Sequence, residues 1–205
     1  MITGKKVVFR AIEEKDVKHL QKWHNDSVLS ELVVGWTFPV SMQEEHEWYL
    51  NSLKNKTVKR FIIENKNKSI IGLTGLWEID WKNRNALTAV KIGEKTNRGR
   101  GYGFDAIMTM MSYAFYDIGL NRVWSTIIEY NVASYNAYVR KCGWKVEGRL
   151  RKHIFRKGKF HDLLYVSALK EDFEKWAQAK EYIPSAFLGK NKQCVRINDS
   201  EKIIF

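Results

Sequence analysis

Six consecutive residues near the middle of the chain, Arg98-Gly99-Arg100-Gly101-Tyr102-Gly103, place glycine at every second position. A β-rich segment precedes them, and an apolar run typical of a helix follows at 104–118. Glycine lets the backbone approach a ligand and adopt positive φ angles, and the start of a helix presents unpaired N–H groups. We therefore predict a loop that binds a phosphate or pyrophosphate, with the Arg98 and Arg100 side chains as secondary contacts. A solvated turn without a ligand is the alternative.

Two better-known phosphate-binding loops do not fit this segment. The P-loop requires Gly-Lys followed by Ser or Thr, which the segment lacks. The dinucleotide fingerprint spaces its glycines G-x-G-x-x-G near the start of a βαβ unit. Here the spacing is G-x-G-x-G, halfway along the chain. Both of these classes of nucleotide-binding loop are therefore excluded.

The loop resembles the acyl-CoA loop of the GNAT family of N-acetyltransferases. That family's pattern is Gln or Arg, two residues, Gly, one residue, and Gly or Ala, which Arg98, Gly101 and Gly103 match. Downstream, Asn131-Val132-Ala133-Ser134 resembles the family's second CoA motif, which opens the next helix. The segment Lys-Cys-Gly-Trp-Lys-Val-Glu-Gly-Arg-Leu-Arg at 141–151 resembles part of the RimJ/RimL-like branch, whose members acetylate protein N-termini, polyamines and other amines.

The start of the chain resembles the opening strand and first helix of that branch, through Val7-Val8-Phe9-Arg10-Ala11 followed by Glu14-x-Asp16. Four motifs thus occur in order over about residues 5–175. The resemblance implies a mixed α/β (α+β) fold, with helices flanking a central, mostly antiparallel twisted sheet that is splayed at the cofactor site. Residues 1–180 are expected to form a single acetyltransferase domain, and 181–205 a C-terminal extension of unknown role.

The resemblance further implies an acetyl-CoA-dependent N-acetyltransferase that moves an acetyl group to a primary amine by direct attack in a ternary complex. The amine would be a protein N-terminus or a small molecule. Acetyl-CoA is the expected co-substrate, and no metal is expected. Polyamines, amino sugars and aminoglycosides are alternative acceptors. A second hypothesis is a non-catalytic acyl-CoA-binding or RNA-associated module on the same fold.

The resemblance also assigns roles around the second CoA motif. The strand that ends near Ile92 is expected to splay from the strand 123–128, with the pantetheine arm of the cofactor in the gap between them. Asn131 would hydrogen-bond that arm, and Ser134 would lie beside it at the start of the helix. N-capping of the helix is an alternative role for both residue types and is compatible with the first.

Family members often use a tyrosine seven residues after that asparagine, as the general acid for the thiolate leaving group. Counting from Asn131, this residue is Tyr138. The distance in sequence from Asn131 to Gly143 is one residue longer than usual. Counting back from Gly143 therefore selects Val139 instead, and Tyr135 is a further candidate.

A candidate for the general base comes from the strands that precede the glycine loop. The branch often carries a glutamate there, but Leu87 occupies that position. The other carboxylates near strand ends are Glu78, Asp80 and Glu94. Glu78 lies in Leu-Trp-Glu-Ile-Asp, which resembles a segment of polyamine acetyltransferases, so Glu78 is the candidate base. A surface carboxylate on an alternating strand is the alternative reading.

The acceptor side is expected to involve the segment 33–39 and a late hairpin, because these regions line the acceptor site in the family that the chain resembles. Within and near them, Trp36, Phe38 and Trp81 are candidates for an apolar wall that contacts the substrate.

The amino-acid composition restricts which binding partners and which cellular location are expected. The chain has 205 residues and a formal net charge of +12, and its 35 Lys and Arg are spread along the sequence. This distribution suits an anionic cofactor better than nucleic acid. Apolar runs are too short for a membrane span, no signal peptide is visible, and the two cysteines, Cys142 and Cys194, form no metal-ligand cluster. A cytoplasmic protein is expected, and a homodimer is left open.

The elements that must position these residues follow from hydrophobic periodicity and turn residues. Helices are expected at 14–25, 41–53, 104–118, 134–142 and 171–180. The second of these helices begins with a capping box formed by Ser41 and Glu44. Strands are expected at 6–11, 60–64, 69–77, 87–92 and 122–128, followed by a hairpin of 144–151 and 160–169.

Overall fold

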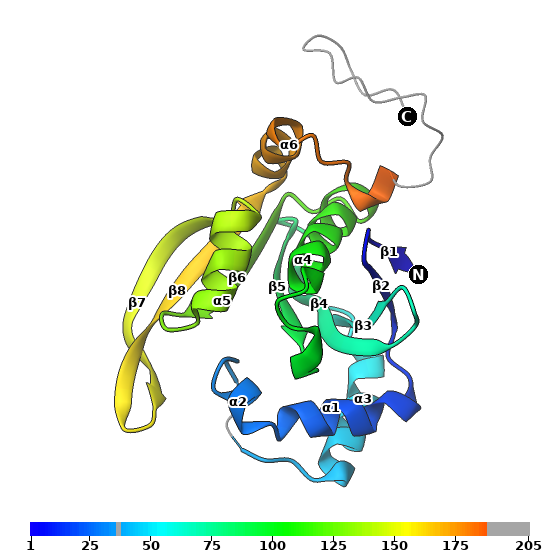
Figure 1. Cartoon of the computed structure of the whole chain (residues 1–205), viewed down its shortest axis with the longest axis vertical. Helices are drawn as coiled ribbons and strands as arrows, with labels where there is room; N and C mark the ends of the chain where they lie inside the picture. Colours follow the sequence, from blue (N-terminus) through cyan, green and yellow to red (C-terminus); the bar gives the residue numbers. More distant parts are fainter. Residues whose placement is uncertain (36–37, 188–205) are drawn as a thin grey trace.

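A single sheet organises the computed structural model, which describes residues 1–35 and 38–187. Within them, eight strands lie in the order β1 (Ile2–Thr3), β2 (Val7–Ala11), β3 (Lys59–Asn65), β4 (Ile70–Asp80), β5 (Asn85–Ile92), β6 (Arg122–Ile128), β8 (Lys159–Leu169) and β7 (Lys145–Arg156) (Figure 1). Neighbours are antiparallel except β5 and β6, which are parallel. The expected mixed architecture with a mostly antiparallel sheet is confirmed.

The helices are short and are interrupted by tighter or wider turns. The α-helices are α1 (Val17–His24), α2 (Ser27–Ser30), α3 (Met42–Lys54), α4 (Tyr102–Ser112), α5 (Val132–Tyr135) and α6 (Lys170–Ala179). Three 3₁₀ turns, η1 (Glu14–Asp16), η2 (Lys95–Asn97) and η5 (Ser185–Phe187), flank them. Two π-helical segments, η3 (Tyr113–Asp117) and η4 (Asn136–Lys141), continue α4 and α5.

The helices cover both faces of the sheet because successive strand residues point to opposite sides. Ile63 on β3 packs into a core with α4, η3 and η4. Its neighbour Ile62 packs into a second core with α1, α2 and α3. Figure 1 shows α4 and α5 across one face of the sheet and α1 and α3 gathered near one end of β3 and β4. The sheet therefore separates two helical layers.

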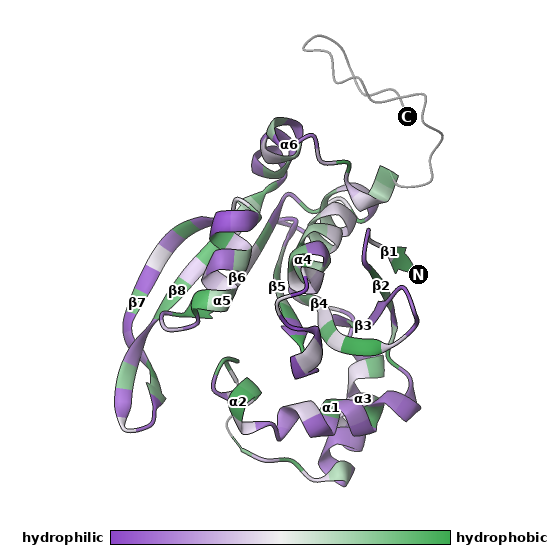
Figure 2. Ribbon diagram, in the orientation of Figure 1, coloured by the Kyte–Doolittle hydropathy of each residue, from purple (hydrophilic) through white to green (hydrophobic). Residues whose placement is uncertain are grey.

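Hydropathy follows this arrangement (Figure 2). Residues 105–112 of α4 are all buried, which explains why this helix is apolar around most of its surface. The edge strand β7 is mostly hydrophilic, and most of its residues are exposed. Polar side chains on an edge strand oppose pairing with other chains, so this edge is protected against aggregation.

The predicted capping box of α3 is present. The backbone N–H of Glu44 donates to Ser41 Oγ at 3.1 Å, and the backbone N–H of Ser41 donates to Glu44 Oε2 at 2.7 Å. The predicted strands and longer helices are also found, with shifts of a few residues at their ends. The short elements β1 and α2 were not predicted, because two or four residues carry no readable periodicity.

The sheet opens between β5 and β6. These strands pair only through Asn85, Ala86 and Leu87, which lie opposite residues 122–124. Beyond that point β5 continues to Ile92 beside β4, and β6 continues to Ile128 beside β8. The two strands therefore diverge toward the glycine loop, as the resemblance implied.

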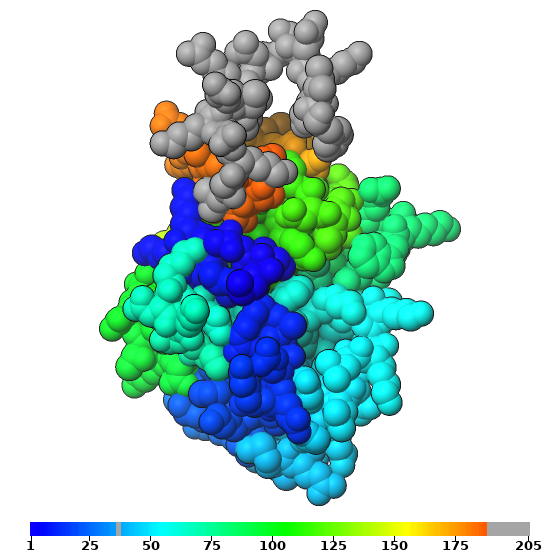
Figure 3. All heavy atoms as spheres, turned by 90° about the vertical axis from the view of Figure 1, so that its right-hand side faces the viewer, coloured from blue at the N-terminus to red at the C-terminus, as the bar shows by residue number. Residues whose placement is uncertain are grey.

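The chain folds back on itself after α6. The Ala186 N–H donates to Ser112 Oγ at 2.8 Å. The ring centroids of Phe187 and Tyr116 are 4.9 Å apart. Figure 3 shows this segment beside the N-terminal residues, where Lys5 Nζ lies 4.3 Å from the ring centre of Tyr182. Packed structure thus continues to residue 187, past the boundary expected at 180. In the described part of the chain, no helix is long and apolar enough to cross a membrane.

Candidate active site

The glycine loop joins β5 to α4 through η2. Gly99 and Gly101 have φ angles of +76° and +83°, which side chains with a Cβ adopt only with strain. Gly101 is the N-cap of α4, so the loop ends at the positive end of a helix dipole. The amides of the first turn of α4 have no partner within the helix. This arrangement suits a pyrophosphate.

The arginines of the loop differ in their surroundings. Arg98 folds back onto the end of β5, where its Nε donates to Ile92 O at 3.1 Å and its Nη2 to Gly93 O at 2.9 Å. Its main contacts therefore hold the loop in place. Arg100 is exposed, and its carbonyl accepts a hydrogen bond from Lys6 Nζ at 3.1 Å. Lys6 thus adds a cation beside the loop that sequence reasoning missed.

Asp105 fixes the start of α4 against the N-terminal strands. Its buried carboxylate accepts hydrogen bonds from the backbone N–H groups of Lys5, Lys6 and Val7 at 3.2, 2.6 and 3.0 Å. A carboxylate that accepts several N–H bonds is stabilised in place. The N-terminus of α4 is therefore held by a contact between residues about one hundred positions apart in the sequence.

Tyr138 lies between the diverging strands. Its side chain is buried, and its hydroxyl oxygen accepts a hydrogen bond from the Val90 N–H of β5 at 3.0 Å. Burial raises the pKa of the Tyr138 hydroxyl above its usual value, so the group keeps its proton. The Val90 N–H points into the gap between β5 and β6. A neutral hydroxyl and a backbone donor therefore meet where the strands have separated.

The spacing from Asn131 to Gly143, which is one residue longer than usual in the family, is accommodated by the π-helical segment η4. A π-helical segment holds one more residue per turn than an α-helix would. With this insertion the buried position falls on Tyr138, whereas Val139 and Tyr135 are only partly buried. The geometry thus favours Tyr138 among the three positions considered from the sequence.

Asn131 and Ser134 open α5. Asn131 Oδ1 accepts a hydrogen bond from the Ser134 N–H at 3.0 Å, which is an N-cap contact. Asn131 Nδ2 donates to Leu32 O at 3.1 Å. The neighbouring Tyr130 hydroxyl donates to Glu31 O at 2.6 Å. Capping is therefore present. The hydrogen bonds that Asn131 and Tyr130 donate also connect the end of β6 with the segment that follows α2.

The structure does not bring Glu78 to the gap. Glu78 is exposed, has a φ angle of +50°, and lies in the bulge between Trp77 and Asp80. That bulge is at the end where β5 and β6 are still paired, about 13 Å along β4 from the position opposite Val90. The bulge turns this side chain toward solvent, away from Tyr138.

The other candidate carboxylates are committed to local contacts. Asp80 accepts hydrogen bonds from the backbone and side chain of Asn83 in the turn after β4. Glu94 accepts from Lys22 Nζ at 2.9 Å and from Trp23 Nε1 at 3.0 Å. These two hydrogen bonds lower the pKa of Glu94.

The apolar wall predicted for the substrate does not form from the described residues. Trp36 lies outside them. Phe38 is 78 % exposed and Trp81 is 56 % exposed. Trp81 sits in the turn between β4 and β5, at the paired end of β5, whereas Phe38 precedes α3. The two aromatic side chains are therefore carried by different ends of the fold.

A pocket that sequence reasoning missed lies on the face of the sheet covered by α1 and α3. It encloses about 90 Å³. We call it the tryptophan pocket, because three indoles line it together with charged and apolar side chains: Leu20, Trp23, His24, Glu45, Trp48, Arg60, Leu73, Trp77 and Lys91. Lys91 directly follows Val90, so the tryptophan pocket lies beside the part of β5 that borders the gap.

The charged groups of the tryptophan pocket influence one another. Arg60 lies over the rings of Trp48 and Trp77, at 4.7 and 5.6 Å from their centroids. Burial lowers the pKa of Arg60 and lowers that of Lys91 to about 8. Burial also raises the pKa of Glu45, whose Oε2 lies 3.1 Å from His24 Nδ1.

One signal in the sequence could have revealed this pocket. Lys91 is the one ionisable residue of the strand 85–92, and an ionisable side chain within a strand needs an explanation. Its partners Arg60 and Glu45 come from a different strand and a helix. Their proximity depends on the sheet register, which single-sequence reasoning does not provide.

Trp23 contacts both the tryptophan pocket and the residues that precede the glycine loop. Its ring lies directly over Gly93, where a Cβ would overlap the indole. Its Nε1 donates to Glu94 in the same segment. The indole therefore lines the pocket and packs on the residues that lead from β5 into the loop.

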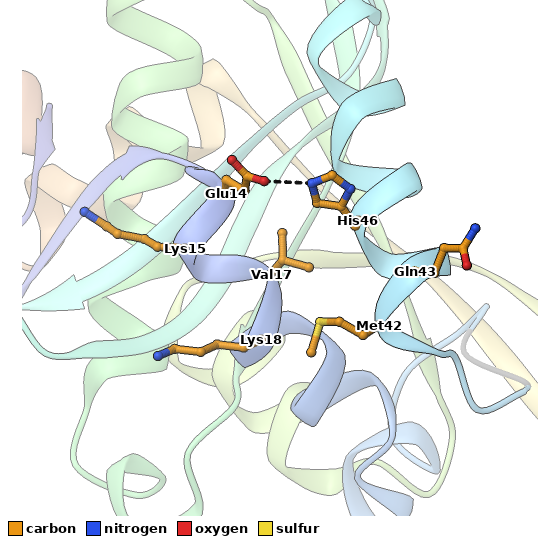
Figure 4. A pocket seen from close by; sticks show the side chains of 7 residues that line it. All are labelled: Glu14, Lys15, Val17, Lys18, Met42, Gln43 and His46. Carbon is orange, nitrogen blue, oxygen red and sulfur yellow. Dashed lines mark hydrogen bonds and ion pairs between the residues drawn. The ribbon is translucent and has the colours of Figure 1, made fainter.

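A second, more open groove lies between η1, α1 and the start of α3 (Figure 4). His46 Nε2 and Glu14 Oε1 face each other across it at 2.9 Å. All of its lining residues come from these helical segments and none from the sheet. This groove is therefore separate from the gap. Among the described residues, no group of three or more His, Cys, Asp or Glu side chains is placed to hold a metal ion.

Comparison with known proteins agrees with this geometry. Residues 6–145 match the acetyltransferase (GNAT) domain family. The SPbeta prophage-derived uncharacterized N-acetyltransferase YokL of Bacillus subtilis is 28% identical over 172 residues, which cover 84% of this chain and 94% of that protein. The spermidine N(1)-acetyltransferase of Vibrio cholerae is 24% identical over 157 residues, covering 77% and 89% of the two chains.

The fold is also shared with solved structures. The crystal structure of spermidine N-acetyltransferase from Vibrio cholerae in complex with CoA and spermine has a TM-score of 0.76, with 24% identity over 82% of this chain and 98% of that one. These matches favour an enzyme over the non-catalytic module considered from the sequence. The chain therefore belongs to the acetyltransferase (GNAT) domain family and is an N-acetyltransferase, with acetyl-CoA as its co-substrate.

Proposed function

We propose that the enzyme transfers the acetyl group to a primary amine by direct attack in a ternary complex, with Tyr138 as the general acid. The observation that carries this proposal is the hydrogen bond between the Val90 N–H and the Tyr138 hydroxyl, at the point where β5 and β6 separate. It brings a backbone donor and a protonated acid to the same point. Acetyl transfer from a thioester needs both.

The loop and the first turn of α4 would hold the pyrophosphate of the co-substrate. The donors are the backbone N–H groups of residues 98–103, and Lys6 and Arg100 add positive charge at the same place. The pantetheine arm would run along the gap past Asn131 and Ser134. This path supports the role that the resemblance assigned to these two residues.

Each group then acts at a defined atom. When acetyl-CoA is bound, the Val90 N–H would donate to the thioester carbonyl oxygen in place of the Tyr138 oxygen and stabilise the negative charge that develops there. The neutral amine attacks the carbonyl carbon, the new C–N bond forms, and the C–S bond breaks. The Tyr138 hydroxyl gives its proton to the departing sulfur, and the amine nitrogen releases a proton to water. Tyr138 then takes a proton back from water, which restores its hydroxyl. The products are an amide and free CoA.

We assign the enzyme to the RimJ/RimL-like branch on the motif at 141–151, and a putative ribosomal N-acetyltransferase of Bacillus subtilis is 33% identical over 106 residues. The acceptor is a protein N-terminus or a small-molecule amine. The free, buried thiol of Cys142 supports a cytoplasmic location, and a homodimer is compatible with the fold.

The test is acetyl-CoA-dependent thiol release against a panel of amines, with mass spectrometry of the products. The panel holds N-terminal peptides, amino acids, spermidine, amino sugars and aminoglycosides. We expect release with at least one amine, together with an acetylated product of the matching mass. Binding of acetyl-CoA without release from any amine would contradict the proposal.

A further inference from the structure

The tryptophan pocket has a charge pattern that indicates which amines the enzyme accepts. We propose that the tryptophan pocket binds a carboxylate group, and that the acceptor is an amine that also carries a carboxylate, such as an amino acid, rather than a polyamine. This inference rests on the proposed acetyl transfer, because it names the acceptor class for the same reaction. It uses residues that the sequence motifs did not include.

Arg60 is the principal group for recognising the carboxylate. Its guanidinium lies over the rings of Trp48 and Trp77, and within residues 1–35 and 38–187 its side chain makes no hydrogen bond to the protein. Stacking on aromatic rings uses the faces of the guanidinium and leaves its N–H edges available. A carboxylate pairs with such an edge through two parallel hydrogen bonds. Arg60 is therefore held ready for a planar anion.

The balance of charge in the pocket also favours an anionic group. Arg60 and Lys91 are two cations, and they face one carboxylate, Glu45. Glu45 is already engaged by His24 at 3.1 Å. Charges removed from water are costly unless they are paired. A carboxylate bound at Arg60 would supply a counter-charge to its guanidinium.

The sheet leaves room for a ligand beside Arg60. In the register of β3, β4 and β5, Arg60 lies opposite Gly75, and Gly75 lies opposite Ala89. Neither residue has a side chain beyond Cβ. A Cβ at Gly75 would press against the backbone carbonyl of Lys59, so this position requires glycine. A row of small residues therefore runs from Arg60 across the sheet to Ala89, the residue before Val90.

A polyamine fits these groups poorly. Polyamines carry several ammonium groups at neutral pH, and Arg60 and Lys91 would repel them. An amino acid has one amine and one carboxylate. With its carboxylate on Arg60, its amine is free to lie toward Val90, on the strand that carries the proposed site of transfer.

The experiment compares matched amines that differ only in the carboxylate. Thiol release is measured with the twenty L-amino acids, with the carboxamide and the decarboxylated amine of each reactive one, and with spermidine. We expect the amino acid to have a kcat/KM about 10- to 100-fold above its carboxamide, as for loss of a charge-assisted pair. Equal or higher activity with carboxamides, decarboxylated amines or spermidine would overturn the inference and leave acetyl transfer intact.

Two substitutions assign the effect to the pocket. Arg60→Gln should raise KM for the amino acid about 10- to 100-fold with little change in kcat or in KM for acetyl-CoA, and Arg60→Lys should recover part of the loss. Lys59→Gln is the matched control. It removes a positive charge from the adjacent, exposed position on β3, outside the pocket, and should leave all constants unchanged.

Direct binding separates failure of this inference from failure of the proposed reaction. Three indoles line the pocket, so amino acids should change the tryptophan fluorescence of the wild type and not that of Arg60→Gln. If no amine is acetylated but this signal is present, the pocket assignment stands and the reaction is wrong. If no amine is acetylated and no Arg60-dependent signal exists, both are wrong.

Discussion

The hydroxyl oxygen of Tyr138 accepts a hydrogen bond from the backbone N–H of Val90, across the gap that opens between β5 and β6. The two residues are 48 positions apart in the sequence. Tyr138 lies on the π-helical segment η4 and is buried there. This contact places an acid and an amide donor together, and it leads to the first of four predictions.

Tyr138→Phe should lower kcat by about 10²- to 10⁴-fold with little change in KM for acetyl-CoA, because it removes the proton donor and keeps the ring. The Val90 N–H loses its acceptor, so the free energy of unfolding should also fall by about 1–3 kcal/mol. Steady-state kinetics and urea denaturation measure the two effects. Tyr135→Phe is the control and should leave kcat unchanged. An unchanged kcat in Tyr138→Phe would assign the proton donor elsewhere.

Gly103→Glu should weaken acetyl-CoA binding by at least about 10-fold, since it sets a negative charge beside the pyrophosphate donors. The fold should be retained. A Cβ at Gly103 meets only Ile92 Cγ1, at 3.9 Å, and an acidic residue in the first turn of a helix is favourable. Calorimetric titration measures the affinity. Gly103→Gln is the control, because it adds a side chain of similar size without the negative charge. Equal acetyl-CoA affinities of Gly103→Glu and Gly103→Gln would argue against electrostatic repulsion.

Gly101 is less suitable for this test, although it belongs to the same motif. Its φ angle of +83° means that any other residue strains the backbone by about 1–2 kcal/mol. A loss of binding in a Gly101 variant would therefore mix a local change of the loop with the loss of donors.

Lys91 should make stability depend on pH in the alkaline range. Its pKa is about 8 in the folded state and near 10.5 when unfolded, so the unfolded chain binds more protons between these values. The free energy of unfolding should rise as the pH increases from about 8 to about 10.5. Urea denaturation at pH 7.5 and pH 10 measures this rise. Lys91→Met should be more stable than the wild type at pH 7.5 and should lose this part of the pH dependence. If the free energy of unfolding changed equally with pH in the wild type and in Lys91→Met, the assignment of this pH dependence to Lys91 would be wrong.

Asp105→Ala should destabilise the fold by about 2–4 kcal/mol, because three backbone N–H groups lose a charged acceptor. It should also weaken acetyl-CoA binding, since the N-terminus of α4 is no longer held against β2. Thermal unfolding and calorimetric titration measure the two quantities. Asp117→Ala, on the π-helical segment that continues α4, is the comparison for loss of a carboxylate away from the loop. Full stability of Asp105→Ala would show that the three contacts contribute nothing.

Local features of the sequence were sufficient for much of the fold. The strand at 122–128 coincides with β6, and the capping box of Ser41 and Glu44 marks the start of α3. The glycine loop could be predicted because positive φ angles and a helix start depend on neighbouring residues. These are the parts of a fold in which short-range chemistry decides the structure.

The rest of the site depends on contacts between distant residues. Glu45, Arg60 and Lys91 meet only after three elements pack, so no spacing in the sequence indicates the tryptophan pocket. Glu78 looked suitable by type, but a bulge in β4 turns it to solvent. The additional residue after Asn131 was visible as a longer spacing. Only the structure shows that η4 absorbs it and that Tyr138 stays buried.

The contact between Trp23 and Gly93 constrains how this sequence can change. The indole occupies the space that any side chain at position 93 would need. An alanine at 93 is therefore compatible with the fold only when position 23 holds a smaller residue, and a tryptophan at 23 requires glycine at 93. Among natural relatives that keep this packing, positions 23 and 93 should vary as a pair, although they are 70 positions apart in the chain.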